Sequence, residues 1–320
     1  MVRATCLALS FAVTAALAAP SLSFAASMGD NPVSVSGIAG IDYYVWQQVG
    51  VSLIRNEAVP LSPILQGNLA SPGGNVELFA NSELPGPGFE TYRDLSNPGI
   101  FAAFLIQPRT TVAGTLNGAP ISIRSLNGED WFTPFGGGAP TPAYGANNLA
   151  NKWLSDFFGF YNLNTILAGA GFTPTDIANA RLGLFAQFLT NNGFPRLSDP
   201  NISYVNQAAP GAGIEIGLAG GDNFLTPAIQ ALLAGPLGRP DLVSIVPPNM
   251  QASELVRVEF NGLPPQYLYS FTSVPSGLST TDGTESYNTT FQVTAAAVPE
   301  PASLGVLALG GLALLARRRR

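Results

Sequence analysis

Hydrophobic and polar positions form short, turn-bounded runs in the first part of the chain. Between Asn31 and about Arg124, β-branched and aromatic residues cluster between turns rich in Gly, Pro and Asn. The runs are Ile41–Val51, Val76–Phe79, Ile100–Ile106 and Ile121–Arg124. Runs of this length and composition, bounded by turn residues, are typical of strands. We therefore expect this part of the chain to be mostly short strands and turns.

The hydrophobic period changes in the middle of the chain. Apolar residues repeat with helical spacing over 148–161 and again after Thr173, up to a stop signal at Asn191-Asn192-Gly193. Thr173 suits the N-cap of the second helix, and Asp176 supplies the reciprocal bond of a capping box. A third, short helix is expected from Thr226 to Gly235. The two longer helices present the apolar faces Leu149, Trp153, Phe157, Phe160 and Ile177, Ala180, Leu184, Phe188.

Alternation of apolar and polar residues returns after residue 250. Over 256–260, apolar side chains alternate with Arg257 and Glu259, which we interpret as a solvent-exposed face. Asn261-Gly262 is a turn signal, and Tyr267, Tyr269 and Phe271 then alternate, so the segment predicts a β-hairpin.

The last strand is expected over Tyr287–Val293, and part of the Ser- and Thr-rich stretch 273–294 is interpreted as a spacer. Taken together, the pattern predicts an α+β fold for residues 26–297, with short antiparallel strands at both ends and a helical middle.

The first residues of the chain are typical of a secretory signal peptide. A basic residue, Arg3, precedes an apolar run from Cys6 to Ala19, and Ser23-Phe24-Ala25 fits a small-x-small cleavage site. We expect the secretion machinery to recognise residues 1–25, with cleavage after Ala25. The alternative is a buried N-terminal helix.

The end of the chain predicts one C-terminal membrane helix. Ser303–Ala316 carries no charge, and counting from Val298 gives an apolar stretch of almost the length that spans a bilayer. The basic residues that follow favour the cytoplasmic side, which would leave the domain before them outside the cytoplasm. They are Arg317, Arg318, Arg319 and Arg320. A buried helix with a solvated basic end is the alternative.

Three features of segment 298–320 resemble the PEP-CTERM sorting signal of bacterial envelope proteins. They are Pro299-Glu300-Pro301, the short apolar helix and the terminal arginine cluster, in that order. The resemblance implies that an exosortase, a membrane protease-transpeptidase, recognises Pro299, Glu300 and Pro301 and removes the tail. It also implies transient residence in the inner membrane, then the cell envelope, cell surface or extracellular matrix of bacteria that make exopolysaccharide.

The body of the chain also resembles an uncharacterised set of PEP-CTERM proteins, a resemblance that carries no known activity. The segments that carry it are 74–79, 144–153, 196–206, 216–220, 251–262, 267–271 and 282–288.

Charge and residue usage exclude several functions. Between Ala26 and Val298 there are nineteen acidic and nine basic residues. This net negative charge repels nucleic acid, so a nucleic-acid partner is excluded. The chain has no histidine, and Cys6, in the signal segment, is its only cysteine. Ser-His-Asp and Cys-His catalysis and ordinary zinc sites are therefore excluded. We predict no catalytic, cofactor-binding or metal-ligating residue and expect the protein not to be an enzyme.

Four segments leave alternatives open. Glu129-Asp130-Trp131 has the composition of a sugar site, or is a loop whose Trp131 and Phe132 enter the core. Asp222-Asn223 is a calcium candidate or a turn, and Ser198-Asp199-Pro200-Asn201 a binding loop or a turn. The aromatic residues Tyr43, Tyr44 and Trp46 pack in the core or stack on sugars.

The favoured hypothesis is a non-catalytic envelope protein associated with the cell surface or with extracellular polysaccharide. A carbohydrate-active enzyme that uses two carboxylates is an alternative, because such chemistry needs neither histidine nor cysteine. A sugar- or calcium-binding module is the other alternative.

Overall fold

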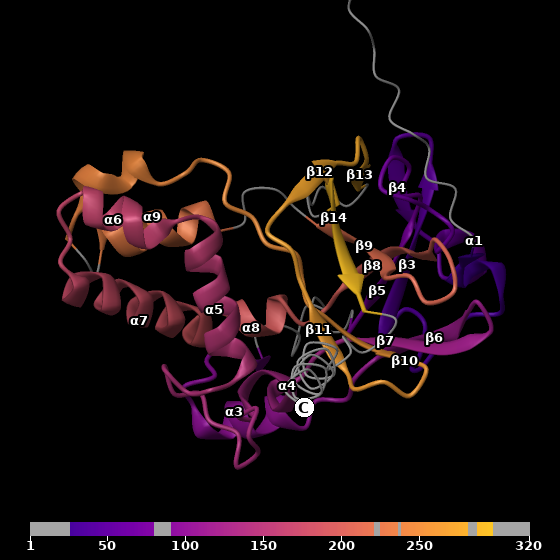
Figure 1. The fold of residues 1–320 in the computed structure, drawn as a ribbon, viewed down its shortest axis with the longest axis horizontal. Helices are drawn as coiled ribbons and strands as arrows, with labels where there is room; N and C mark the ends of the chain where they lie inside the picture. Colours follow the sequence, from indigo (N-terminus) through magenta and orange to yellow (C-terminus); the bar gives the residue numbers. More distant parts are fainter. Residues whose placement is uncertain (1–25, 80–90, 221–224, 236–237, 281–286, 297–320) are drawn as a thin grey trace, which may run out of the picture.

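The computed structural model describes residues 26–79, 91–220, 225–235, 238–280 and 287–296. Figure 1 shows two sheets on one side of the molecule and a group of helices on the other. The fold is therefore mixed helix and sheet, with antiparallel pairing throughout the named strands except between β4 and β13. Among the helices of these residues, none has the length and apolar character needed to cross a bilayer. The predicted signal segment and membrane tail lie outside the described residues.

The larger sheet has nine strands and curls back on itself. Its order is β12 (Ser273–Pro275), β14 (Thr289–Ala295), β9 (Ile214–Gly220), β8 (Asn201–Gln207), β5 (Asn75–Leu78), β3 (Tyr43–Val49), β4 (Ser52–Arg55) and β13 (Ser279–Thr280), and β1 (Ala26–Ser27) also pairs with β8. The two strands at opposite ends of this order, β12 and β13, are joined by residues 276–278 alone. This short connection holds the two edges of the sheet close together (Figure 1).

The smaller sheet packs against one face of the larger one. It has the order β11 (Gln266–Leu268), β10 (Val256–Phe260), β7 (Ala119–Arg124), β6 (Thr111–Leu116) and β2 (Ser34–Val35). Alternate residues of both sheets, such as Val76 and Ile216 from one and Ile123 and Val258 from the other, share one buried cluster. Burial of this apolar face against the other sheet accounts for the two-layer arrangement.

The helical part has an aromatic core of its own. Its elements are α3 (Pro98–Leu105), α4 (Gly128–Phe132), α5 (Leu149–Phe160), α6 (Leu163–Gly169), α7 (Pro174–Thr190), α8 (Gly193–Arg196), α9 (Thr226–Ala234) and the 3₁₀ helix η3 (Pro240–Ile245). Two further short helices, η1 (Met28–Asp30) and α1 (Leu61–Ile64), lie against the sheets. Trp131, Trp153, Phe157, Phe185 and Phe194 are buried between the helices, and large rings of this kind contribute most to such a core.

The three predicted helices are confirmed. The capping box of α7 forms as expected, because Thr173 Oγ1 accepts a bond from Asp176 N at 3.2 Å and Asp176 Oδ2 accepts one from Thr173 N at 2.9 Å. Helix α7 ends at Thr190, before the predicted stop signal, and α9 covers most of the predicted third helix.

The predicted helical middle is only partly right. Strands β8 and β9 lie between α8 and α9 in the sequence and form the centre of the larger sheet. Both are buried along almost their whole length, on both faces. Strand β9 does carry a strand pattern, with Ile214, Ile216 and Leu218 at every second position, and this pattern was not assigned to a strand from the sequence. Part of the stretch 273–294 was expected to be a spacer, and its described residues include β12, β13 and most of β14.

The run Ile100–Ile106, expected among the strands, is a helix instead. Asn97 Oδ1 accepts bonds from Gly99 N at 2.9 Å and Ile100 N at 3.3 Å, which caps α3. Pro98 occupies its first position, where the missing N–H costs nothing. The cap and the proline outweigh the strand preference of the apolar run.

The predicted hairpin is confirmed, with a shorter return strand. Strand β10 pairs with β11 in the register Val256↔Leu268, and β11 ends at Leu268. Beyond Leu268 the ladder is not continued regularly; Ser270 N donates to Ser253 Oγ at 2.9 Å, and the carbonyl of Ser270 accepts from Ser253 N at 2.8 Å. Arg257 and Glu259 form an ion pair of 2.9 Å on the opposite face of β10. The side chain of Arg257 is only 15% exposed, so the predicted solvent-exposed face is partly covered.

Candidate functional site

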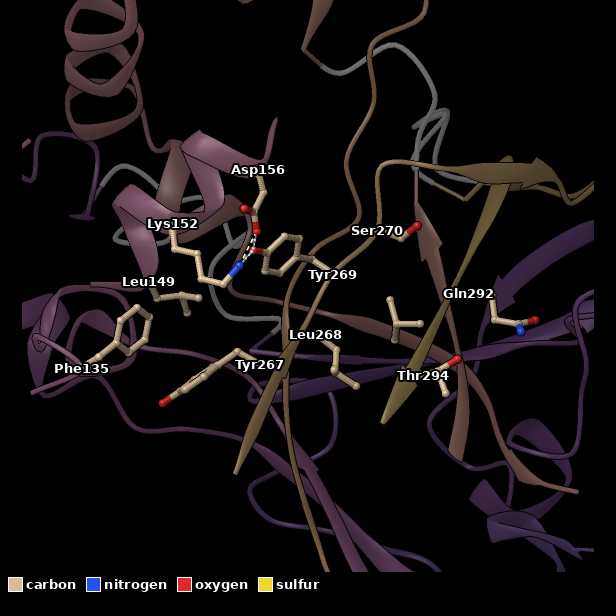
Figure 2. A pocket seen from close by; sticks show the side chains of 11 residues that line it. Phe135, Leu149, Lys152, Asp156, Tyr267, Leu268, Tyr269, Ser270, Gln292 and Thr294 are labelled. Atoms are coloured by element: carbon tan, nitrogen blue, oxygen red, sulfur yellow. Dashed lines mark hydrogen bonds and ion pairs between the residues drawn. The ribbon is translucent and has the colours of Figure 1, made fainter. Parts of the chain in front are cut away.

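A groove runs between the helical part and the edge of the sheets. Its volume is about 530 Å³, and it is lined by residues of α5, β11 and β14 together with Phe135 (Figure 2). Helix α5 supplies Lys152 and Asp156, the segment after β10 supplies Tyr267 and Tyr269, and β14 supplies Gln292. Figure 2 shows Lys152 and Asp156 directed from the helix toward the ring of Tyr269.

Three side chains form a polar network at the centre of the groove. Lys152 and Asp156 are one helical turn apart on α5, and Lys152 Nζ lies 2.5 Å from Asp156 Oδ2. The phenol of Tyr269 donates a hydrogen bond to the same carboxylate oxygen and lies 3.4 Å from Lys152 Nζ. Burial, with the bond to Asp156, raises the pKa of Tyr269 above its ordinary value. The network is therefore charge-balanced, with one cation, one anion and a neutral phenol at neutral pH.

The groove continues along α5 beyond this network. A second hollow of about 520 Å³ is lined by Ser155, Gly159, Phe160, Phe271 and Thr272, and it shares Asp156, Tyr269 and Ser270 with the first. The two hollows thus follow each other along the helix, on either side of the Asp156–Tyr269 contact.

Exposed aromatic rings stand in both hollows. Phe135 is 53% exposed in the first and Phe160 is 54% exposed in the second. Phe160 was expected on the buried face of its helix. Instead it packs edge-on against Tyr161, with ring centroids 4.9 Å apart, and against Phe271 at 5.4 Å.

A second polar network, away from the groove, supports Tyr267 in the groove wall. The phenol of Tyr267 donates to Asp130 Oδ1 at 2.8 Å, while Arg109 Nε donates to Asp130 Oδ2 at 2.7 Å. Burial, with the nearby charge of Asp130, raises the pKa of Tyr267. Because Asp130 is engaged by Arg109 and Tyr267, it is a structural carboxylate that orients the Tyr267 ring.

The segment Glu129-Asp130-Trp131 belongs to the short helix α4, so the loop expected there is wrong. Trp131 and Phe132 are fully buried, which confirms the interpretation that places them in the core. Trp131 Nε1 donates to Ser198 Oγ at 2.7 Å, and Glu129 Oε2 lies 3.2 Å from Arg109 on the surface. Glu129 and Asp130 thus both form ion pairs with the guanidinium of Arg109 and do not face each other across a groove.

Ser198-Asp199-Pro200-Asn201 is an internal turn. All four residues are buried. Ser198 Oγ donates to the carbonyl of Phe194 at 2.6 Å, and Asn201 N donates to Glu254 Oε2 at 3.0 Å. These bonds support the turn interpretation of this segment. Asp222-Asn223 lies outside the described residues. Within the described ranges, no group of three or more Asp, Glu, His or Cys side chains is placed to hold a metal ion.

Tyr44 and Trp46 are buried, which supports core packing for two of the three aromatic residues of β3, whereas Tyr43 is half-buried. The groove was not predicted from the sequence, because its residues come from positions 135, 149–160, 267–272 and 292–294. The one local signal was the i, i+4 spacing of Lys152 and Asp156 on a helix.

Comparison with known proteins identifies the tail. Residues 297–320 match the family described as PEP-CTERM protein-sorting motif. No curated protein and no solved structure matches the chain. The resemblance of the body to an uncharacterised PEP-CTERM set therefore has no support, while the motif supports an exported protein that exosortase-type machinery sorts to the cell envelope.

Proposed function

We propose that this protein is a non-catalytic component of the cell envelope whose groove along α5 binds a neutral polysaccharide at the cell surface or in the extracellular matrix. The sorting motif at 297–320 supports the destination. The observation that supports a polysaccharide ligand is the groove itself, which has an exposed aromatic ring in each hollow and a charge-balanced polar network between them.

The chemistry of the groove suits a sugar. Ligand sites combine apolar surface with a few fixed polar groups that set orientation. Phe135 and Phe160 offer exposed ring faces, and Lys152, Asp156 and Tyr269 offer fixed donors and acceptors between them. Because the charges of Lys152 and Asp156 cancel, the groove has no net attraction for a polyanion or a polycation. A neutral polymer is the favoured ligand class.

The groove also suits a chain rather than a single sugar. Its two hollows follow one another along α5 and share Asp156, Tyr269 and Ser270. The aromatic rings stand on opposite sides of this shared region. An extended polymer could therefore contact both rings while its hydroxyl groups meet the central network.

Two features support binding without turnover. Among the described residues that line the two hollows, Asp156 is the only carboxylate, and it is already bonded to Lys152 and Tyr269. Glycoside hydrolysis needs a second carboxyl group on the opposite side of the scissile bond. Asp130, which bonds the phenol of Tyr267 in the groove wall, is also engaged by Arg109.

The test is affinity electrophoresis of residues 26–296 through gels that contain neutral or anionic polysaccharides, including neutral polymer released from the producing cells. We expect retardation by a neutral polymer, and a loss of affinity of about tenfold in Phe160→Ala and in Phe135→Ala. Tyr144→Ala is the control, since Tyr144 is a partly exposed aromatic residue that lines neither hollow.

Two results would contradict the proposal. One is equal retardation of the groove variants and the wild type. The other is release of reducing ends from the polymer that stops in Asp156→Asn, which would indicate a carboxylate-based enzyme instead.

A further inference from the structure

The last described residue of the chain is held by one side chain. Gln266 Nε2 donates to the carbonyl of Ala296 at 2.9 Å, and Ala296 N donates to Gln266 Oε1 at 2.8 Å. The amide of Gln266 thus uses both its donor and its acceptor on the backbone of a single residue. It reproduces the pair of bonds that a neighbouring strand would make.

The residues before Ala296 are part of the core. Strand β14 pairs with β9 along its whole length, up to Ala295↔Ile214. Val293 and Ala295 are buried in the cluster between the two sheets. Gln266 begins β11 of the smaller sheet, so its bonds to Ala296 join the smaller sheet to the end of the larger one.

The fixed part of the chain ends very close to the sorting motif. Only Ala297 and Val298 separate Ala296 from Pro299, the first residue of Pro299-Glu300-Pro301. A fully extended chain covers at most about 11 Å over three residues. Before processing, the folded domain must therefore stand within about this distance of the motif.

We propose that Gln266 is a latch on processing: the sorting protease acts on the tail only after Ala296 is released from Gln266. Proteins that bind peptide segments in extended form do so through backbone N–H and C=O groups. At Ala296 both of these groups are already taken. Release breaks two hydrogen bonds at the edge of the fold, so it is a local opening and not global unfolding.

This inference is independent of any ligand in the groove. It rests on the sorting motif and on the contacts of Gln266. When opening and closing are fast relative to cleavage, the rate of proteolysis follows the population of the open form. Loss of two modest hydrogen bonds should therefore raise processing by about three- to tenfold.

The experiment is a pulse-chase of the full chain in a host that carries the sorting protease, with the processed fraction measured by intact mass. Four variants are compared with the wild type. They are Gln266→Ala, an insertion of eight Gly and Ser residues between Ala296 and Ala297, the combination of both, and Gln48→Ala. Gln48 is the matched control, since its amide also bonds a backbone carbonyl, that of Gly50 in the turn between β3 and β4.

We expect faster processing in Gln266→Ala and in the insertion variant. The combination should be no faster than the insertion alone, because the inserted residues already free the motif from the latch. An insertion variant processed at the wild-type rate would overturn the proposal, and it does so even if Gln266→Ala misfolds, because the insertion leaves residues 26–296 unchanged. Equal acceleration by Gln48→Ala would overturn it as well.

Discussion

The indole nitrogen of Trp46 donates a hydrogen bond of 2.6 Å to Oε2 of Glu77. The phenol of Tyr287 donates to the same oxygen at 2.8 Å, and Glu77 is only 1% exposed. A carboxyl group on a central strand of the larger sheet is thus held by side chains from β3 and from the segment before β14. The contact joins positions 46, 77 and 287, and it stabilises the curled arrangement of the sheet on the face away from the smaller sheet.

Tyr287→Phe tests how much this buried contact contributes. The substitution removes one hydroxyl and leaves the ring in place, so a buried carboxyl oxygen loses a donor. We expect the free energy of unfolding to fall by about 1.5–3 kcal/mol in urea denaturation. Tyr144→Phe, at a partly exposed ring, should change it by less than about 0.5 kcal/mol. Equal effects of the two substitutions would show that the bond between Tyr287 and Glu77 does not stabilise the fold.

Gly262 tests the turn of the β10–β11 hairpin. Leu263 N bonds to the carbonyl of Phe260 at 2.9 Å, and the two central residues have positive φ, 50° at Asn261 and 74° at Gly262. This is the turn that matches the twist of paired strands. A Cβ at 262 would meet no atom within 4 Å. Gly262→Ala should therefore cost about 1–2 kcal/mol through backbone conformation alone.

The control for the turn is Asn261→Gly, which keeps the left-handed conformation accessible. Its free energy of unfolding should stay close to that of the wild type. If Gly262→Ala is as stable as Asn261→Gly in thermal unfolding, the positive φ is not what holds this hairpin.

Tyr269 predicts how stability changes in alkali. Its pKa is raised in the folded state by burial, followed by the bond to Asp156 and its charge. An unfolded tyrosine loses its proton near pH 10, when the folded one still keeps it. The contribution of Tyr269 is therefore fully present below about pH 10 and is lost as the pH rises above that value. The free energy of unfolding of Tyr269→Phe should therefore fall less steeply than that of the wild type as the pH rises from about 9.5 to 11.

The measurement for Tyr269 is urea denaturation at a series of pH values. Tyr267, whose pKa is raised by burial and by Asp130, should give a slope change of the same sign in Tyr267→Phe. Slopes identical to that of the wild type in both variants would mean that these phenols titrate as they do in the unfolded chain.

Asp156→Asn tests the charge balance of the groove. The substitution leaves Lys152 without its 2.5 Å ion pair, so the groove gains one positive charge. We expect measurable binding of an anionic polysaccharide that weakens as salt is added. Asp241→Asn is the matched control, because Asp241 pairs with Arg239 at 2.8 Å outside the groove. A gain of anion binding in both variants would assign it to net charge and not to the groove.

The sequence alone determined the features that depend on neighbouring residues. The capping box of α7 involves Thr173 and Asp176, three positions apart, and the hairpin turn involves the adjacent Asn261 and Gly262. The sorting motif is likewise a contiguous segment, matched over 297–320. Short-range chemistry of this kind is readable because the partners are fixed in space by the chain itself.

Tertiary structure decided everything that depends on distant partners. Strands β8 and β9 are buried on both faces because other parts of the fold cover them, so even polar residues such as Asn201, Ser203 and Asn206 are buried. The groove exists because Tyr269 leaves the hairpin to meet Asp156, 113 positions earlier in the chain. The latch joins Gln266 to Ala296. No pattern in one segment encodes these contacts, because each partner becomes available only when the two sheets and the helical part have packed together.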